Sequence, residues 1–375
     1  MQLFKVCLES FGYTLPDEIV TSSDLETRLG PIYERLRLPH GRLELITGVR
    51  QRRFWPAGTM PSEKSVFSAE QALQVADFDR RRIGALIHAS VCRDHLEPAT
   101  ASAVHHRLGL PADCQVFDLS NACLGLLNGL LQIGTMIEAG QIEAGIVVGT
   151  EGSRQLVETT IDELNTNESL TRKSIKSAIA SLTIGSGSCA MLVTHSDLSK
   201  TQNRVLGGSV RANTQFHDLC QSGADEAGAG MSPLMDTDSE TLMREGCATG
   251  AANFERFLQE LDWTRDNIDK TVCHQVGPTH QKAMFESLAM DTEKDFTTVE
   301  WLGNTGSVAL PITMAVAAEQ GHLQANDHVG MFGIGSGINC VMLGCHWQHS
   351  LVGTATPLKE LRSISHKTSI ANDPS

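Results

Sequence analysis

Clustered positive charge is scarce in this sequence. It contains 30 Lys and Arg residues against 44 Asp and Glu residues, which gives a formal net charge of −14 and a pI near 5.4. Proteins that bind nucleic acids or anionic membranes in a general way use clustered Lys and Arg side chains to meet the phosphates. The composition therefore argues against both functions, and no nucleic-acid partner is predicted.

A long apolar run, a secretory signal and paired cysteines are also lacking. The most apolar segment, 121–137, is interrupted by Asn121, Asn128 and Gln132, so it falls short of the roughly 18 apolar residues that a membrane span needs. The first ten residues, MQLFKVCLES, do not resemble a secretory signal, and the ten cysteines contain no CxxC pair. These absences predict a cytoplasmic protein with reduced thiols and no membrane span.

Signatures of metal and dinucleotide binding are missing as well. The neighbouring residues His105 and His106 and the isolated cysteines lack the usual spacing of zinc ligands. The glycine-rich segment FGIGSG at 332–337 is similar to a dinucleotide fingerprint, but such a fingerprint must open a helix. Here a second strand-like run, INCVMLGCHW, follows it. No metal site and no dinucleotide cofactor are predicted.

The sequence has enough apolar material for one large folded unit or two fused ones, with 41% hydrophobic residues in 375. Short apolar or β-branched runs alternate with longer segments of helical period; the runs are GALIHASVC (84–92), AGIVVGTE (144–151), KTVCHQV (270–276) and HVGMFGIG (328–335). This alternation predicts an α/β fold whose parallel strands are buried on both faces. The segment 122–140 is apolar almost all round, which predicts a helix buried on all sides.

The chain contains an internal repeat. The tetrapeptide IGSG at 184–187 recurs at 334–337, an offset of 150 (334 − 184), and the strand-like CAML at 189–192 is matched by CVML at 340–343, an offset of 151 (340 − 189). A duplicated fold is the simplest cause, although chance similarity of a short Gly-Ser motif is the alternative.

The repeat predicts two similar halves, 1–195 and 196–349, followed by a polar tail at 350–375 that has no periodicity. Adding 151 to Cys123 gives His274. The two residues are therefore expected to occupy corresponding places in the two halves, with a catalytic site on the axis between them.

Cys123 is the candidate nucleophile. In QVFDLSNACLGLL a strand-like run meets the apolar helix at Asn121-Ala122-Cys123, so the thiol is expected on or next to the first helical turn. The unpaired N–H groups and the positive end of the helix dipole at such a position lower the pKa of a cysteine below its free value of about 8.5. The alternative is a buried structural thiol, which describes most cysteines.

Two further residues could assist a cysteine nucleophile. His274 closes the apolar run TVC, and strand ends facing a crevice are where α/β folds carry working residues. Asn304 lies in a Gly-Asn-Thr-Gly turn, and its neutral amide can donate to an oxyanion. Backbone N–H groups of Cys123 and of the turn near Gly335 could form an oxyanion hole. Taken singly, the histidine also fits a locally hydrogen-bonded strand end and the asparagine a simple turn.

Five segments together resemble the ketoacyl synthase III branch of the thiolase superfamily. They are DLSNACLG (118–125), HQVGPTH (274–280), GNTGSVALP (303–311), FGIGSG (332–337) and TGVRQRRF (47–54). The resemblance spans nearly the whole chain, and its specificity lies in the order and spacing of the segments. It implies a five-layered αβαβα thiolase fold of two duplicated halves, a homodimer, and a catalytic triad of Cys123, His274 and Asn304.

A loop resembles the OleA-type enzymes, which condense two acyl-CoA molecules head to head in long-chain olefin biosynthesis. The segment SVCRDHLEPATAS at 90–102 contains a Leu-Glu-Pro piece that ordinary ketoacyl synthase III proteins lack, and Val276-Gly277 replaces their Ala-Asn pair. The resemblance implies that Glu97 reaches into the active site of the partner subunit and acts as a base. By analogy with the family, three arginines meet the phosphates of CoA: Arg50, Arg52 and Arg53.

The resemblance predicts an acyltransferase that joins two fatty acyl-CoA thioesters through an acyl-Cys123 intermediate to give a β-keto acid or β-ketoacyl product. Coenzyme A thioesters are then substrates, no cofactor is required, and enzymes of hydrocarbon or lipid biosynthesis take up the product. Two alternatives stay open: decarboxylative condensation of acyl-CoA with malonyl-ACP, and a non-catalytic subunit that only binds acyl chains.

Overall fold

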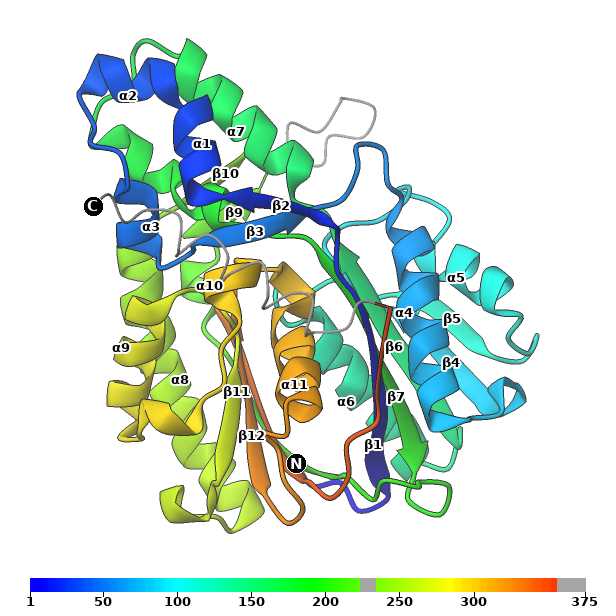
Figure 1. Cartoon of the computed structure of the whole chain (residues 1–375). Helices are drawn as coiled ribbons and strands as arrows, with labels where there is room; N and C mark the ends of the chain where they lie inside the picture. The colour runs from blue at the N-terminus through cyan, green and yellow to red at the C-terminus, as the bar shows by residue number, and fades with distance from the viewer. Residues whose placement is uncertain (223–233, 356–375) are drawn as a thin grey trace, which may run out of the picture.

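A mixed β-sheet folded into two arms forms the centre of the molecule (Figure 1). The computed structural model describes residues 1–222 and 234–355. One arm has the order β5-β4-β6-β7-β1 and the other β8-β13-β12-β11, and a single residue pair joins β1 to β8. The strands of the two arms are β1 (Val6–Thr14), β4 (Ile83–His88), β5 (Gln115–Asp118), β6 (Ala144–Glu151), β7 (Gly187–His195), β8 (Arg204–Ala212), β11 (Lys270–Cys273), β12 (His328–Gly335) and β13 (Asn339–His346).

Helices cover both faces of each arm, which produces five layers (Figure 1). Two helices lie between the arms, α6 (Gly125–Glu138) and α11 (Ala309–Glu319). The outer face of the first arm carries α4 (Pro61–Ala76) and α5 (Thr100–Leu108), and the outer face of the second carries α8 (Ser239–Leu261) and α9 (Pro278–Leu288). The predicted α/β fold with an αβαβα arrangement is therefore confirmed, and the four runs predicted as strands overlap β4, β6, β11 and β12.

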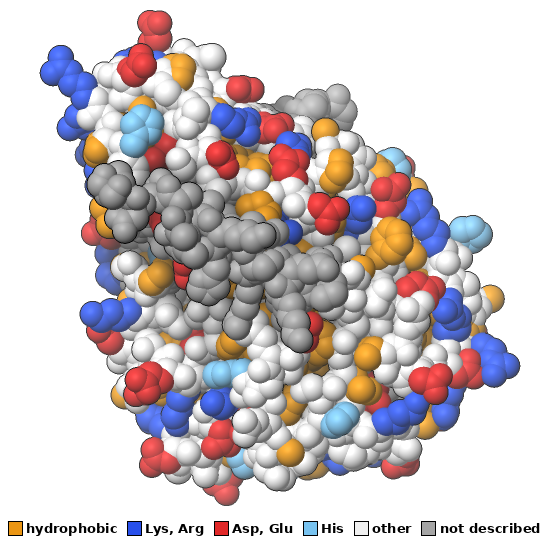
Figure 2. Space-filling model, in the orientation of Figure 1, with side chains coloured by type: hydrophobic (Ala, Val, Ile, Leu, Met, Phe, Trp, Pro, Cys, Tyr) orange, Lys and Arg blue, Asp and Glu red, His pale blue; other side chains and the backbone are white. Residues whose placement is uncertain are grey.

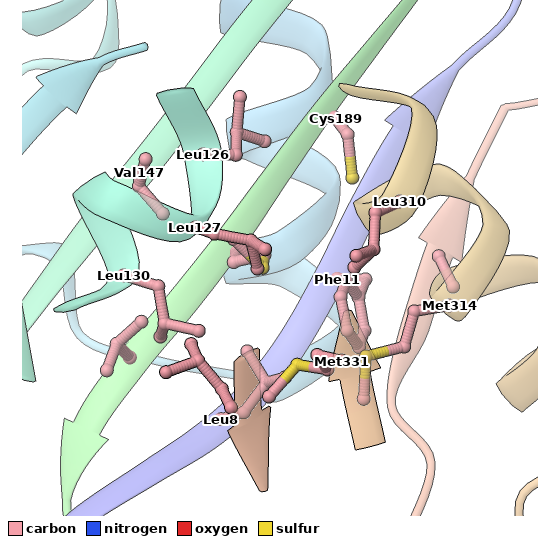
Figure 3. Packing of buried hydrophobic residues seen from close by; sticks show 14 of the residues in the cluster. Leu8, Phe11, Leu126, Leu127, Leu130, Val147, Cys189, Leu310, Met314 and Met331 are labelled. Atoms are coloured by element: carbon pink, nitrogen blue, oxygen red, sulfur yellow. The ribbon is translucent and has the colours of Figure 1, made fainter. Parts of the chain in front are cut away.

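The central layer is held by apolar packing from both arms. Leu127 of α6 and Leu310 and Met314 of α11 face one another between the strands, and Phe11 of β1 and Met331 of β12 close the cluster (Figure 3). Each fully buried side chain of this size stabilises the fold by about 1.5–3 kcal/mol relative to leaving it in water. The ends of the two central helices are therefore fixed rigidly with respect to both arms.

The helix α6 is not buried on all sides, as the sequence had indicated. Asn128 is half-buried, and Gln132 and Thr135 are exposed. Gln132 is four residues after Asn128, and Thr135 is three residues after Gln132, so the three side chains share one face of the helix. Together with Ser120 and Asn121 they border an open concavity on the surface. Because most residues of 122–140 are apolar, the sequence did not indicate this narrow polar stripe.

The two arms repeat one strand arrangement. In the first, β4 and β6 are parallel and β7 is antiparallel to β6; in the second, β11 and β12 are parallel and β13 is antiparallel to β12. This order makes β4 the counterpart of β11, and α6 the counterpart of α11.

The expected correspondence between Cys123 and His274 is therefore wrong. Cys123 precedes the central helix α6, so its counterpart lies before α11, where Asn304 is found. His274 follows β11, so its counterpart is Ala89, which follows β4. The offset of 151 holds for the last strands of the arms but not elsewhere, because the segments between the strands differ in length.

The segment predicted as a polar tail begins with regular structure. Strand β14 (Val352–Thr354) pairs with β1 in parallel, so the prediction of a tail from residue 350 is wrong for these three residues. The remainder of that segment, 356–375, lies outside the described residues. No helix within 1–222 and 234–355 is long and apolar enough to cross a membrane.

Smaller elements cover one end of the two arms (Figure 1). They are the ribbons β2 (Glu18–Thr21) with β3 (Gln51–Phe54) and β9 (Cys220–Ser222) with β10 (Met235–Thr237), and the helices α1 (Ser22–Arg28), α2 (Gly30–Leu36), α3 (Arg42–Thr47), α7 (Arg154–Thr166) and α10 (Val299–Leu302). Acidic and basic side chains are interspersed over the face in Figure 2, in keeping with the scarcity of clustered positive charge in the sequence.

Candidate active site

Cys123 lies in a sharp turn between β5 and the central helix α6. The preceding residue, Ala122, has a φ of 44°, a left-handed conformation that is strained for a residue with a Cβ. The N-terminal end of α6 can approach the sheet closely because Gly125 has no side chain: a Cβ there would lie 3.0 Å from the carbonyl oxygen of Ala89. The turn therefore holds the thiol at the junction of the central layer and the first arm.

The thiol does not have the lowered pKa that its position near a helix start suggested. Burial raises the pKa of Cys123 to about 12, with smaller contributions in the same direction from the charge of Glu151 and from Cys220, while its own backbone N–H acts in the opposite direction. Helix α6 begins at Gly125, two residues later, so the dipole is weak at the sulfur. The thiol is protonated at neutral pH.

Gly335, at the end of β12, lies against Cys123. A Cβ on Gly335 would be 3.5 Å from the Cβ of Cys123 and 3.6 Å from its backbone nitrogen. The structure therefore brings together the two residues whose N–H groups were expected to form an oxyanion hole.

His274 follows β11 and adjoins the same strand end. Its backbone N–H donates to the carbonyl oxygen of Phe332 at 2.9 Å, which ties it to β12 three residues before Gly335. Among the described residues, its buried ring nitrogen Nδ1 has no hydrogen-bond partner. Burial, assisted by His280, lowers the pKa of His274 to about 4, so its imidazole is neutral at neutral pH and can accept a proton.

Asn304 lies in a turn between α10 and α11. Its backbone N–H donates to Thr183 and its carbonyl accepts from Gly185, so the turn is fixed to the segment that leads into β7. Its side-chain oxygen Oδ1 accepts from the N–H of Gly306 at 3.0 Å. Because that bond occupies the oxygen, the NH₂ group of the amide is left to donate to a substrate.

Glu97 lies on the loop between β4 and α5, with its side chain exposed. Within 1–222 and 234–355 its carboxylate makes no hydrogen bond or ion pair. Two apolar side chains on the same loop, Val91 and Leu96, are 48% and 57% exposed. The loop therefore presents a carboxylate flanked by apolar groups to the outside of this chain.

The arginines expected to bind CoA have different environments. Arg52 is fully buried and donates to the carbonyl oxygens of Val20 and Leu182, and burial lowers its pKa to about 10. Arg53 is 3% exposed and donates to the carbonyl oxygen of Pro16. The expectation that these two meet CoA phosphates is wrong, because β3 directs both into the protein. Arg50 is half-buried, and no such contact to another described residue occupies its side chain.

Two carboxylates near the site were missed at the level of sequence. Glu151 ends β6 and contacts Ser307 and the start of the Glu97 loop. Asp295 accepts from the N–H of Cys273, directly before His274, and from Gln281 of α9. The only available signal was the position of Glu151 at the end of the apolar run AGIVVGTE, where a charged residue is unusual in a buried strand.

Comparison with known proteins agrees with this arrangement. Residues 258–347 match the family model of the 3-oxoacyl-[acyl-carrier-protein] synthase III C terminal. The chain is 40% identical over 351 residues to an acyl-CoA:acyl-CoA alkyltransferase of Shewanella oneidensis, covering 92% of this chain and all of that protein. It is 34% identical to an acyl-CoA:acyl-CoA alkyltransferase of Xanthomonas campestris pv. campestris, covering 88% of this chain and 94% of the relative.

Solved structures have the same fold. A glutamate-to-glutamine variant of Xanthomonas campestris OleA superposes with a TM-score of 0.87 at 32% identity, covering 92% of this chain and 98% of the other. Variants of the same OleA at a cysteine and at a histidine superpose equally well.

The layers and the cysteine turn define a thiolase-fold acyltransferase. Within that superfamily, the chain belongs to the ketoacyl synthase III branch and, more narrowly, to the OleA-type acyl-CoA:acyl-CoA alkyltransferases.

Proposed function

We propose that this protein condenses two fatty acyl-CoA molecules through an acyl intermediate on Cys123. The observation that carries the proposal is the contact between Gly335 and Cys123, which places the two residues expected to form the oxyanion hole side by side at the junction of the two arms. The alkyltransferases and OleA structures to which the chain is similar support the same reaction.

In the first half-reaction, Cys123 attacks the thioester carbonyl of one acyl-CoA. Because the thiol is protonated and His274 is neutral at neutral pH, the thiol proton moves to the imidazole as the carbon–sulfur bond forms. The N–H groups of Cys123 and Gly335 hold the oxyanion. CoA then leaves as the thiol and takes the proton back from the imidazolium.

In the second half-reaction, a second acyl-CoA loses a proton from the carbon next to its carbonyl. Glu97 of the partner subunit accepts the proton, and the NH₂ group of Asn304 donates to the enolate oxygen together with His274, in the tautomer that carries hydrogen on the nitrogen facing the substrate. The carbanion attacks the carbonyl carbon of the acyl group on Cys123, and Cys123 leaves as the thiolate. The proton held by Glu97 then passes to this thiolate. The product is a β-ketoacyl-CoA, or a β-keto acid after hydrolysis.

The role of Glu97 requires a homodimer, which several surface features support. Among the strands of the described residues, β5 is at an edge of the sheet and has an unpaired side, and the polar stripe of α6, formed by Asn128, Gln132 and Thr135, lies next to the turn that follows β5. An exposed strand edge is a ready template for pairing with a second copy. The exposed Val91 and Leu96 would be buried beside Glu97 in such a dimer.

The test is incubation of the purified protein with myristoyl-CoA alone, measuring free CoA and analysing extracted products by mass spectrometry. We expect a condensed β-keto product or the ketone that forms from it on loss of CO₂. Cys123→Ala should form neither acyl-enzyme nor product, whereas Glu97→Ala should form the acyl-enzyme without product. Glu168→Ala, which also removes an exposed loop glutamate, is the matched control and should behave as wild type.

Mixed dimers decide whether Glu97 acts across the interface. Co-expression of a Cys123→Ala chain with a Glu97→Ala chain yields one site that has Cys123 from one chain and Glu97 from the other. Recovery of condensation in the purified mixed dimer supports the proposal, and a mixed dimer as inactive as the two parent variants contradicts it.

Two results would move the assignment elsewhere. If CoA is released but a condensed product forms only when malonyl-ACP is added, the protein is a decarboxylative ketoacyl synthase III. If acyl-CoA binds without CoA release under either condition, it is a non-catalytic acyl-binding subunit.

A further inference from the structure

Glu151 is a buried carboxylate that the proposed reaction does not use. It is 6% exposed at the end of β6. Its oxygen Oε1 accepts from the hydroxyl of Ser307 at 2.5 Å, from the N–H of the same serine at 3.3 Å and from the N–H of Val91 at 3.1 Å; its Oε2 accepts from the N–H of Cys92 at 3.4 Å. All of these donors are neutral. In the part of the chain that the structure describes, no Lys, Arg or His side chain pairs with Glu151.

The donors belong to two separate segments of the site. Val91 and Cys92 begin the loop that carries Glu97, and Ser307 follows the turn that carries Asn304. A carboxylate is a stronger acceptor than a neutral oxygen, so a charged side chain is well suited to hold two backbone segments together in a buried place.

Glu151 also supports the orientation of the Asn304 side chain. The backbone N–H of Gly306 donates to Oδ1 of Asn304, and Gly306 itself has a φ of 59°. A Cβ on Gly306 would lie 3.2 Å from the carboxyl carbon of Glu151, so the backbone of the turn rests directly on the carboxylate. A shift of this carboxylate would move the N–H group that fixes the Asn304 amide.

We propose that Glu151 is a positioning residue for the condensation, which ties the loop of the base Glu97 to the turn of the enolate donor Asn304. This inference rests on the proposed function. Acyl transfer to Cys123 needs the thiol, His274 and the oxyanion hole, whereas condensation also needs Glu97 and Asn304. Loss of Glu151 should therefore impair condensation more than acylation.

Glu151 also acts on the Cys123 thiol through its charge. The charge of Glu151 is, after burial, the largest influence that raises the pKa of the Cys123 thiol. Removing the charge while keeping the shape, as in Glu151→Gln, should increase the thiolate fraction of Cys123.

The experiment compares Glu151→Gln with wild type in the full-length protein. Acyl-enzyme formation from myristoyl-CoA is measured by intact mass, condensed product by extraction, and alkylation of Cys123 by iodoacetamide from about pH 7 to about pH 10. We expect acylation to change little and alkylation to become faster. Condensation should fall by on the order of 10²-fold, the cost of a displacement of about 1 Å in a reacting geometry. Glu143→Gln, an exposed carboxylate directly before the opposite end of β6, is the matched control and should match wild type.

Three outcomes would overturn the inference: wild-type condensation in Glu151→Gln, an equal loss of both half-reactions, or unchanged alkylation of Cys123. If Glu151→Gln does not fold, Ser307→Ala decides, because it removes only the 2.5 Å bond. That variant must lose condensation relative to acylation, and an equal effect on both contradicts the inference. If wild type itself forms no condensed product, the proposed function fails, and the alkylation profile still tests the link between Glu151 and Cys123.

Discussion

Gly335 of the second arm of the fold lies directly against the turn of Cys123 in the first arm. Gly335→Ala would put a Cβ 3.2 Å from Leu124 and 3.5 Å from the Cβ of Cys123. Because the φ of Gly335 is not in the left-handed region, alanine fits the backbone, and we expect a loss of stability of about 1–2 kcal/mol.

The same substitution should slow acylation of Cys123 by on the order of 10²-fold, because the added methyl group displaces the oxyanion from its N–H donors. The rate is measured by intact mass after mixing with acyl-CoA. Gly30→Ala, at a position where a Cβ would meet nothing within 4 Å, is the control. Wild-type acylation in Gly335→Ala would rule out an oxyanion hole at this contact.

The reactivity of the free Cys123 thiol should depend on pH in an unusual way. With a pKa raised to about 12 by burial, its alkylation by iodoacetamide should still be rising at about pH 10, where a free cysteine with a pKa of about 8.5 has reached its plateau. Mass spectrometry of the labelled Cys123 peptide, with N-acetylcysteine as the reference thiol, gives the profile. A plateau reached by about pH 10, as for the reference thiol, would contradict the raised pKa of Cys123.

Arg52 should matter for stability and not for substrate affinity. Arg52→Met leaves the carbonyl oxygens of Val20 and Leu182 without their donor, so we expect the free energy of unfolding to fall by roughly 2–3 kcal/mol, as for other hydrogen bonds to charged groups. Urea unfolding measures the loss. KM for acyl-CoA should stay unchanged in Arg52→Met and rise in Arg50→Ala; a raised KM with wild-type stability in Arg52→Met would restore the CoA-binding role.

Asp295 should make stability fall as the pH rises. Burial raises its pKa from 3.8 to about 6, against the effect of its donors Gln281, Cys273 and Thr271. Between about pH 4 and pH 6 the folded chain keeps a proton that the unfolded chain has released, so the folded state loses stability through this window, and the full cost remains above it.

Asp295→Asn removes this titration. The difference of 2.2 pKa units (6 − 3.8) corresponds to an upper limit of about 3 kcal/mol, reduced by any hydrogen bond that the amide cannot replace. The free energy of unfolding of variant and wild type is measured with urea at about pH 4.5 and about pH 7.5. We expect the advantage of the variant over wild type to be larger at about pH 7.5. Asp266→Asn, at an exposed position, is the control. A stability difference that does not change with pH would show that Asp295 does not titrate in this window.

The sequence alone determined the class of fold and the family of the protein. Alternation of short apolar runs with helical segments depends on local periodicity, and β6 and β12 lie where their runs predicted them. The spacing of the motifs around Cys123, His274 and Asn304 was enough to identify the family to which the comparisons assign the chain.

Only the tertiary structure decided how these residues relate to one another. Cys123 corresponds to Asn304 in the repeat, and not to His274, because strand order, and not a constant offset, defines equivalent places. The burial of Arg52 and Arg53 could not be predicted from sequence, because adjacent strand residues point to opposite sides and only the tertiary structure shows that both sides of β3 are covered.

The sign of the Cys123 pKa shift was decided in the same way. The sequence contains the local helix start, which lowers the pKa, but the larger opposing effect comes from burial and from Glu151, which is 28 residues away (151 − 123). Desolvation depends on all the groups that surround an atom, and those groups come from distant segments. A local pattern in the sequence cannot contain that information.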